Sequence, residues 1–273
     1  MVPKAKANIL ILNKAVFKCF CNFVKISLMN LIIDIGNSSI KLFIFVNSKI
    51  IFQEKIIENN FIESLKAIHN NYVILNIICS SVTKNYDNVL YKIFKNLNIY
   101  KLSDKKLKLP FQNNYESTES LGQDRIGLVT AAILEYPDQN NLIIDLGTCI
   151  TYDFVDFERI YHGGAISPGL KTRYQSIKEN TSKLPLLEFK KINKIIGSTT
   201  DDSIHIGISN GIIGEIKEYI RCLSKSYLNF NVIITGGDST FLRNKIKNAI
   251  FANQNFIAKG LNYIIKHNEA NNK

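Results

Sequence analysis

Two short stretches of this sequence carry the residues best suited to bind phosphate. LIIDIGNSS spans residues 31–39 and LIIDLGTCI spans residues 142–150, so Leu-Ile-Ile-Asp-x-Gly recurs at an offset of 111 positions. In each copy an aspartate, Asp34 or Asp145, ends an apolar run typical of a buried strand, and the following glycine leaves backbone N–H groups open to an anion. A carboxylate beside polyphosphate is repelled unless a cation intervenes, so the pair indicates Mg²⁺ with a nucleotide.

A single copy of this pattern is better explained as an ordinary hairpin whose Asp and Gly serve the turn. Two copies with the same five identities favour a shared ligand. Short hydrogen-bonding side chains follow each glycine: Asn37, Ser38 and Ser39 in the first copy, Thr148 and Thr151 in the second.

A third motif, LGQDRIG (121–127), places Asp124 beside Arg125 at the start of a predicted helix. The helix dipole favours an ionised carboxylate there, which suits a group that accepts the proton of a hydroxyl. Arginine can hold a substrate carboxylate. Taken alone, however, the motif is better explained as a helix cap with a surface arginine.

Other motifs are weaker when taken one at a time. Glycine-rich turns occur in YHGGAISPGL (161–170) and in TGGD (235–238), where the chain can pass close to a nucleotide. The four histidines lack metal-binding spacing and are interpreted as surface or cleft residues. Cys149 has no evident histidine partner, so we expect a small filler rather than a nucleophile. The absence of G-x-x-x-x-G-K-[ST] and G-x-G-x-x-G argues against P-loop and Rossmann chemistry.

Composition sets broader limits. The 273 residues can bury a full core, and the net charge of +11 comes from lysines spread along the chain, so we expect no nucleic-acid partner. Five cysteines without C-x-x-C fit neither a disulfide framework nor a zinc site, which favours a reducing cytoplasm.

No apolar run approaches the roughly 20 residues that cross a bilayer. The basic stretch 1–28 lacks a clean signal-peptide pattern, so we interpret it as an extension and expect the fold to begin at Met29.

The pattern of elements repeats in the two halves of the chain. A three-strand meander (31–57), a helix (60–70), a buried strand (72–82), a helix (85–98), an irregular stretch (101–121) and a helix (124–136) are predicted first. The second half restarts with strands in 141–169, helices at 170–180 and 202–226, a strand in 231–239 and two further helices around 253–260. This order implies a layered α/β fold with domains at 29–140 and 141–273.

Taken in order, the motifs resemble those of type III pantothenate kinases. They are DIGNSSIK (34–41), LGQDR (121–125), DLGTCIT (145–151), GGAISPG (163–169), GSTT (197–200), TGGD (235–238) and KGL (259–261). This family belongs to the acetate and sugar kinase, heat-shock ATPase and actin superfamily. The resemblance implies two tandem ribonuclease-H-like (actin-like ATPase) domains, each a mixed β-sheet flanked by helices, around a nucleotide cleft.

The resemblance also implies an activity: a cytoplasmic homodimer that uses ATP, Mg²⁺ and a monovalent cation (K⁺ or NH₄⁺) to phosphorylate pantothenate, the first step of coenzyme A synthesis. Asp124 would be the catalytic base. The ATP site would contain Asp34, Ile35, Gly36, Asn37, Ser38, Ser39, Ile40, Lys41 and Thr148. Substrate contacts would come from Tyr115, Gly122, Gln123, Asp124, Arg125 and Thr200. Asp145 would bind the monovalent cation, and Asp34 would bind Mg²⁺ through water.

The chain departs from the family pattern at two places. Glu116-Ser117-Thr118 replaces the Asn-Pro that often follows the tyrosine, and Thr199 stands where Asn is common. Alternative readings are a kinase for a sugar or another carboxylic acid, or a catalytically weak relative that acts as a transcriptional activator or another nucleotide-binding protein. Asp34, Asp124, Arg125 and Asp145 favour catalysis, because a pure binding protein needs no base.

Overall fold

The computed structural model describes residues 29–253 and 255–271, so the predicted extension 1–28 lies outside the described residues. The chain forms two mixed sheets. The first contains β1 (Met29–Ile35), β2 (Ile40–Val46), β3 (Lys49–Ile56), β4 (Ile74–Ser81) and β5 (Asn98–Lys101). The second contains β6 (Gln112–Asn113), β7 (Asn140–Leu146), β8 (Cys149–Val155), β9 (Ile160–Pro168), β10 (Phe230–Thr235) and β11 (Ala249–Phe251).

The two sheets share one topology. The first has the order β3-β2-β1-β4-β5, and the second has the corresponding order β9-β8-β7-β10-β11 with β6 added at the β9 edge. In both, the first three strands form an antiparallel meander and the last two run parallel to the first. The repeated aspartates therefore end equivalent central strands, β1 and β7, as the sequence repeat predicts.

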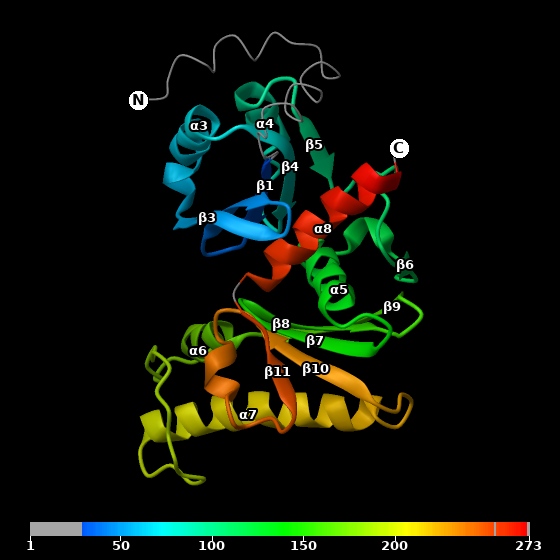
Figure 1. Cartoon of the computed structure of the whole chain (residues 1–273). Helices are drawn as coiled ribbons and strands as arrows, with labels where there is room; N and C mark the ends of the chain where they lie inside the picture. Colours follow the sequence, from blue (N-terminus) through cyan, green and yellow to red (C-terminus); the bar gives the residue numbers. More distant parts are fainter. Residues whose placement is uncertain (1–28, 254, 272–273) are drawn as a thin grey trace.

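Helices and sheets alternate in layers (Figure 1). The helices are α3 (Phe61–Asn71), α4 (Asp87–Ile93), α5 (Gln123–Glu135), α6 (Leu170–Glu179), α7 (Thr200–Leu223) and α8 (Phe256–Asn271), with 3₁₀ turns η1 (Glu58–Asn60), η2 (Thr118–Ser120) and η3 (Ser239–Leu242). Side chains of α3 and α4 cover the outer face of the first sheet, and those of α6 and α7 cover the outer face of the second. Between the sheets lie α5 and α8. The predicted fold class is confirmed.

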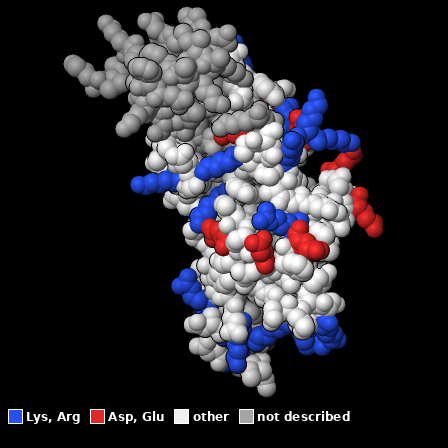
Figure 2. All heavy atoms as spheres, turned by 45° about the vertical axis from the view of Figure 1, so that its right-hand side comes forward, with Lys and Arg blue, Asp and Glu red and all other residues white. Residues whose placement is uncertain are grey.

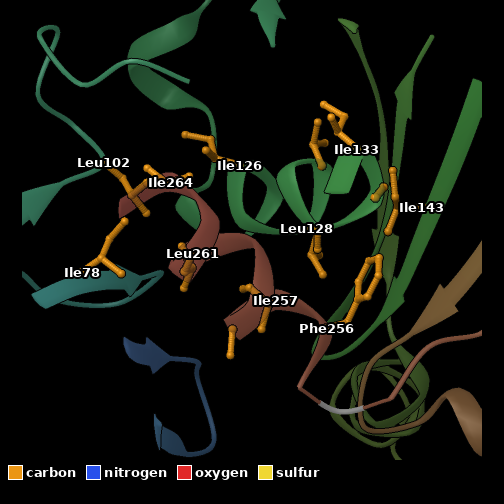
Figure 3. Packing of buried hydrophobic residues seen from close by; sticks show 14 of the residues in the cluster. Ile78, Leu102, Ile126, Leu128, Ile133, Ile143, Phe256, Ile257, Leu261 and Ile264 are labelled. Atoms are coloured by element: carbon orange, nitrogen blue, oxygen red, sulfur yellow. The ribbon is translucent and has the colours of Figure 1, made fainter. Parts of the chain in front are cut away.

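One continuous core joins the two halves. Ile32 and Ile78 of the first sheet and Ile143 of the second are fully buried in the same cluster as side chains of α5 and α8. Figure 3 shows these helices presenting Leu128 and Leu261 to the space between the sheets. The core therefore depends on both sheets at once.

Two glycines allow α5 and α8 to cross at close range. A Cβ on Gly260 would lie 2.0 Å from the carbonyl oxygen of Gly127 and 2.7 Å from the amide nitrogen of Ala131. Both of these are backbone atoms, which a rotamer change cannot move aside. The crossing therefore requires glycine at position 260.

Buried asparagines fix α8 on the first sheet. Asn262 of α8 accepts a hydrogen bond from Asn30 of β1 at 2.9 Å, and Asn30 in turn accepts one from Asn76 of β4 at 2.9 Å. The Asn262 amide also donates to the carbonyl of Asn47 at 2.8 Å. Because an unpaired buried amide is costly, this network sets one register for the helix.

Two predicted elements were wrong. The helix predicted at 85–98 ends at Ile93, and residues 98–101 form β5 instead. The helix predicted before 253 is absent from the described residues, where η3 and β11 stand in its place. Both strands are short and end their sheets, so tertiary pairing outweighs local propensity. The domain division at 140/141 stays a prediction, but α8 packs on β1 and β4 of the first half.

Replacing Gly260 with alanine should destabilise the fold by on the order of 3 kcal/mol, because the added methyl group meets backbone that cannot yield. Urea unfolding would measure the change. Gly214→Ala in α7 is the matched control, since no atom lies within 4 Å of its added Cβ. It should stabilise the chain slightly through helix propensity, and equal losses in the two variants would contradict this account.

Candidate active site

Strand alternation brings two of the predicted site residues, Asp34 and Asp145, onto the inner faces of the two sheets. Ile32 and Ile143 belong to the core between the sheets, so Asp34 and Asp145, two residues further along their strands, face the same space. Both lie at the carboxyl ends of central strands, where open α/β sheets bind ligands. The start of α5 enters this space between them.

The first hairpin pairs Asp34 with Lys41. The two residues are direct partners in the ladder, and the lysine ammonium lies 3.4 Å from Oδ2 of the carboxylate. Burial raises the pKa of Asp34, Lys41 opposes that shift, and the charge of Asp124 adds to it.

The turn between β1 and β2 is closed by the Gly36 amide, which donates to the Ser39 carbonyl at 3.1 Å. Asn37 and Ser38 are exposed at its tip. The side chains of Ile35 and Ile40 pack in the outer core instead. Only the backbone of these two isoleucines is left for the ATP contact that the resemblance implies.

The second hairpin holds Asp145 against a glycine turn. Gly236 has φ of +96°, and a Cβ there would lie 2.6 Å from Oδ1 of Asp145 and 2.4 Å from the Leu146 carbonyl oxygen. The amide of Asp238 donates to that same carbonyl at 3.1 Å, so TGGD is fastened to the end of β7. The pKa of Asp145 is raised to about 7, first by burial and then by the charges of Asp124 and Asp34.

Asp124 lies in the first turn of helix α5. Oδ1 of Asp124 accepts the Arg125 amide at 2.8 Å, and Oε1 of Gln123 accepts the Ser81 amide at 2.9 Å, which docks the helix on the end of β4. Burial is the largest effect on Asp124 and raises its pKa, in the direction opposite to that expected from the helix dipole. A raised pKa makes the carboxylate a stronger base.

Arg125 is not a surface arginine. It is 4% exposed, and its Nε donates to Oδ1 of Asp153 at 2.7 Å. The Tyr161 hydroxyl donates to the same oxygen at 2.7 Å, and the Tyr115 ring centroid lies 5.4 Å from the guanidinium carbon. Sequence reasoning missed Asp153. Counting alternate residues along β8 from Thr151 would have placed it on the inner face.

The charges of this site suit a bound cation. Four carboxylates lie close enough for charge effects: Asp124 raises the pKa of Asp34, Asp145 and Asp153, while Lys41 and Arg125 oppose these shifts. Oxygen donors in negative excess are what hard cations prefer. Among the described residues no group of three acidic, histidine or cysteine side chains is close enough to hold a metal by itself. The residues therefore fit an ion that shares its coordination with phosphate and water.

The structure does not bring Thr200 to these carboxylates. Thr200 begins α7 and lines a hollow of about 960 Å³ with residues of α6 and α7, on the outer side of the second sheet. None of the four carboxylates lines that hollow. Thr148 lies in the β7–β8 turn, where its carbonyl accepts the Gly169 amide and the Thr172 hydroxyl, so α6 holds this turn.

Two smaller expectations are corrected. Cys149 is exposed, so it fills no gap in the core. His205 is 5% exposed, so it is neither a surface nor a cleft residue. Its buried Nδ1 is paired with the Tyr174 hydroxyl at 2.7 Å.

Two further observations concern the surface charge of the molecule and the hydropathy of its helices. Figure 2 shows Lys and Arg interspersed with Asp and Glu on one face of the molecule. None of the described helices has the length and apolar character needed to cross a bilayer.

The sequence is similar to those of known kinases. A family model described as type III pantothenate kinase matches residues 30–222. A type III pantothenate kinase of Christiangramia forsetii is 41% identical over 242 residues, covering 88% of this chain and 99% of that protein. One from Bacteroides fragilis is 38% identical over 241 residues, covering 88% and 98%.

Solved structures share the fold. A protein described as a 2-dehydro-3-deoxygalactonokinase from Sinorhizobium meliloti has a TM-score of 0.60 at 12% identity, covering 87% of this chain and 98% of that one. A protein described as a Baf family transcriptional activator from Campylobacter jejuni has a TM-score of 0.56 at 24% identity, covering 88% and 99%.

The raised pKa of Asp145 makes a prediction about stability and pH. Between about pH 4 and pH 7 the unfolded chain has this carboxyl ionised while the folded chain keeps it protonated, so wild-type stability falls as pH rises through that window. Asp145→Asn imitates the protonated form and should escape the loss. Its free energy of unfolding should gain on the wild type by about 1.4 kcal/mol for each pKa unit of the shift.

Urea unfolding at pH 4.5 and pH 7.5, in choline chloride without potassium, ammonium or magnesium, would measure this difference. Asp138→Asn, at a carboxylate whose side chain is 79% exposed, is the control and should follow the wild type. A constant difference between Asp145→Asn and the wild type at both pH values would contradict the assignment.

Proposed function

This chain belongs to the type III pantothenate kinase family, and from that premise we propose how its residues phosphorylate pantothenate. It is a kinase that transfers phosphate from ATP to pantothenate in coenzyme A synthesis. The observation that supports the proposed site best is that the charges of Asp124 and Asp34, which come from distant parts of the sequence, raise the pKa of Asp145.

We assign the proton transfer to Asp124. The primary hydroxyl oxygen of pantothenate attacks the γ-phosphorus of ATP, its proton passes to the carboxylate, and the bond from the γ-phosphorus to the β–γ bridging oxygen breaks to release ADP. The raised pKa of Asp124 suits a group that must take up this proton. Arg125 and Tyr115, which lie together, would bind the carboxylate-bearing substrate.

The two hairpins would hold ATP. Backbone N–H groups of the turn after Asp34, with Lys41, would face the phosphates, and Thr148 would contact ATP from the second turn. Mg²⁺, bound near Asp34 through water, would neutralise charge on the transferring phosphate, and a monovalent cation, K⁺ or NH₄⁺, would offset the charge of Asp145. Positioning and charge neutralisation supply most of the acceleration in such transfers.

We also propose a homodimer whose sites are shared between subunits. Thr200 is separated from the carboxylates of its own chain by the second sheet, so its contact with pantothenate would come from a second copy. Ile195 and Ile196, just before α7, are 86% and 84% exposed, and such apolar exposure fits an interface. The free thiols Cys79, Cys149 and Cys222 fit a cytoplasmic location.

The non-enzymatic alternative is not favoured. The likeness to a protein described as a transcriptional activator is below 25% identity and supports the fold alone. The relatives that share 38–41% of their residues with this chain are named as kinases. A screen of pantothenate against sugars with ATP would test the substrate class.

Asp124→Asn should lower kcat by about 10²-fold or more, the loss expected when a positioned base is removed, while the affinity for ATP stays near that of the wild type. Steady-state kinetics and ATP titration would measure both quantities. Asp138→Asn is the matched control on an exposed loop and should keep full activity. Near-normal turnover in Asp124→Asn would remove this residue from the role.

A mixture of two inactive chains should recover activity if Thr200 acts across the dimer. Asp124→Asn and Thr200→Ala homodimers each lack one component in both sites, whereas a mixed dimer regains one complete site. After co-expression at equal levels, about a quarter of wild-type activity is expected at low pantothenate concentration, because half of the dimers are mixed and half of their sites are intact.

The control for this complementation is a mixture of Asp124→Asn and Asp124→Ala, which cannot form a complete site in any pairing. Recovery in the control, or none in the test mixture despite mixed dimers, would show that Thr200 serves its own chain.

A further inference from the structure

The two hairpins differ at one equivalent position. Asp34 is paired across its ladder with Lys41, and Asp145 is paired across the corresponding ladder with Thr151. Because directly paired residues point to the same face with Cβ atoms about 5 Å apart, each aspartate has its partner's side chain beside it. The first hairpin therefore contains its own cation, and the second offers a hydroxyl in its place.

The Thr151 hydroxyl has no partner of its own. Thr151 is 8% exposed, and its Oγ1 makes no hydrogen bond in the described residues. Buried hydroxyls are rarely left in this state, so a group absent from the protein is a natural partner. The negative charges of Asp124, Asp34 and Asp153 act on its neighbour Asp145, and Lys41, which is paired with Asp34, opposes them.

We propose that the Thr151 hydroxyl is a ligand of the monovalent cation bound at Asp145, in the place that corresponds to the Lys41 ammonium beside Asp34. This inference rests on the proposed cation site. A hydroxyl and a carboxylate are both oxygen donors, which suit a weakly held cation of this kind. A bound NH₄⁺ ion would be chemically equivalent to the ammonium group of Lys41. A bound K⁺ ion would have a similar size and the same charge.

The arrangement also favours an ion over a fixed side chain at this position. Asp145 lies against the Gly236 turn, where an added Cβ would lie 2.6 Å from Oδ1 of the carboxylate, so this turn brings no side chain of its own to Asp145. Thr151 itself is nearly buried. A small cation can enter such a space together with the nucleotide and leave again.

Thr151→Val tests the proposal because valine keeps the shape of threonine and removes its hydroxyl. The thermal unfolding temperature of the full chain would be followed during titration with KCl, with choline chloride holding the ionic strength constant. The potassium concentration that gives half of the stabilisation should rise about tenfold, the size expected when a neutral ligand of a charged group is lost. Thr151→Ser, which keeps the hydroxyl, should stay near the wild type.

Thr130→Val is the matched control. Thr130 lies in α5, is fully buried, and also has a hydroxyl without a partner in the described residues, but it is not paired with Asp145. This variant should keep the potassium dependence of the wild type. Asp145→Asn should show no potassium-specific stabilisation.

The outcomes separate the two proposals. A potassium dependence unchanged in Thr151→Val, or weakened equally in Thr151→Val and Thr130→Val, would overturn the role of Thr151. A wild type that is not stabilised by K⁺ or NH₄⁺ would instead remove the cation site itself, while pantothenate phosphorylation by the same preparation would leave the kinase function standing.

Discussion

Like charges that share one partly buried space are the constraint on which this molecule depends. Asp34, Asp124 and Asp145 come from β1, α5 and β7. The charge of Asp124 raises the pKa of Asp34, and the charges of Asp124 and Asp34 raise the pKa of Asp145. Like charges repel, so in an unfolded and solvated chain these groups would move apart. In the folded chain the common core of two sheets and two helices holds them together. The folded chain thus keeps a surplus of negative charge in this space, which suits the binding of cations.

Much of the fold follows from the sequence. The Leu-Ile-Ile-Asp-x-Gly repeat predicts two equivalent hairpins, and the sheets do share one strand order. Alternation along β1 and β7 is enough to place both aspartates on inner faces. The short strands β5 and β11 could not be foreseen, because pairing with a neighbour defines them more than composition does. The packing of α8 on the first sheet depends on the distant partners Asn30 and Asn76.

The candidate site, like the fold, could be predicted from the sequence only in part. Asp34, Asp124 and Asp145 could be named from motif and turn chemistry. Asp153 belongs to no motif: strand alternation can place it on the inner face, but its pairing with the buried Arg125 is visible only in the structure. The motif also could not predict that burial raises the pKa of Asp124. A helix start favours the ionised form, but the depth of the site is a tertiary property that no local pattern carries.

The position of α8 has a consequence for biosynthesis. This helix is the last element of the described chain, and yet it completes the core beneath β1 and β4 of the first sheet. A ribosome adds on the order of 10 residues each second, so the N-terminal sheet waits many seconds with its inner apolar face only partly covered. Cotranslational folding of the first half therefore stops short of the native state, and a chain truncated before Phe256 would leave that face open to chaperones and proteases.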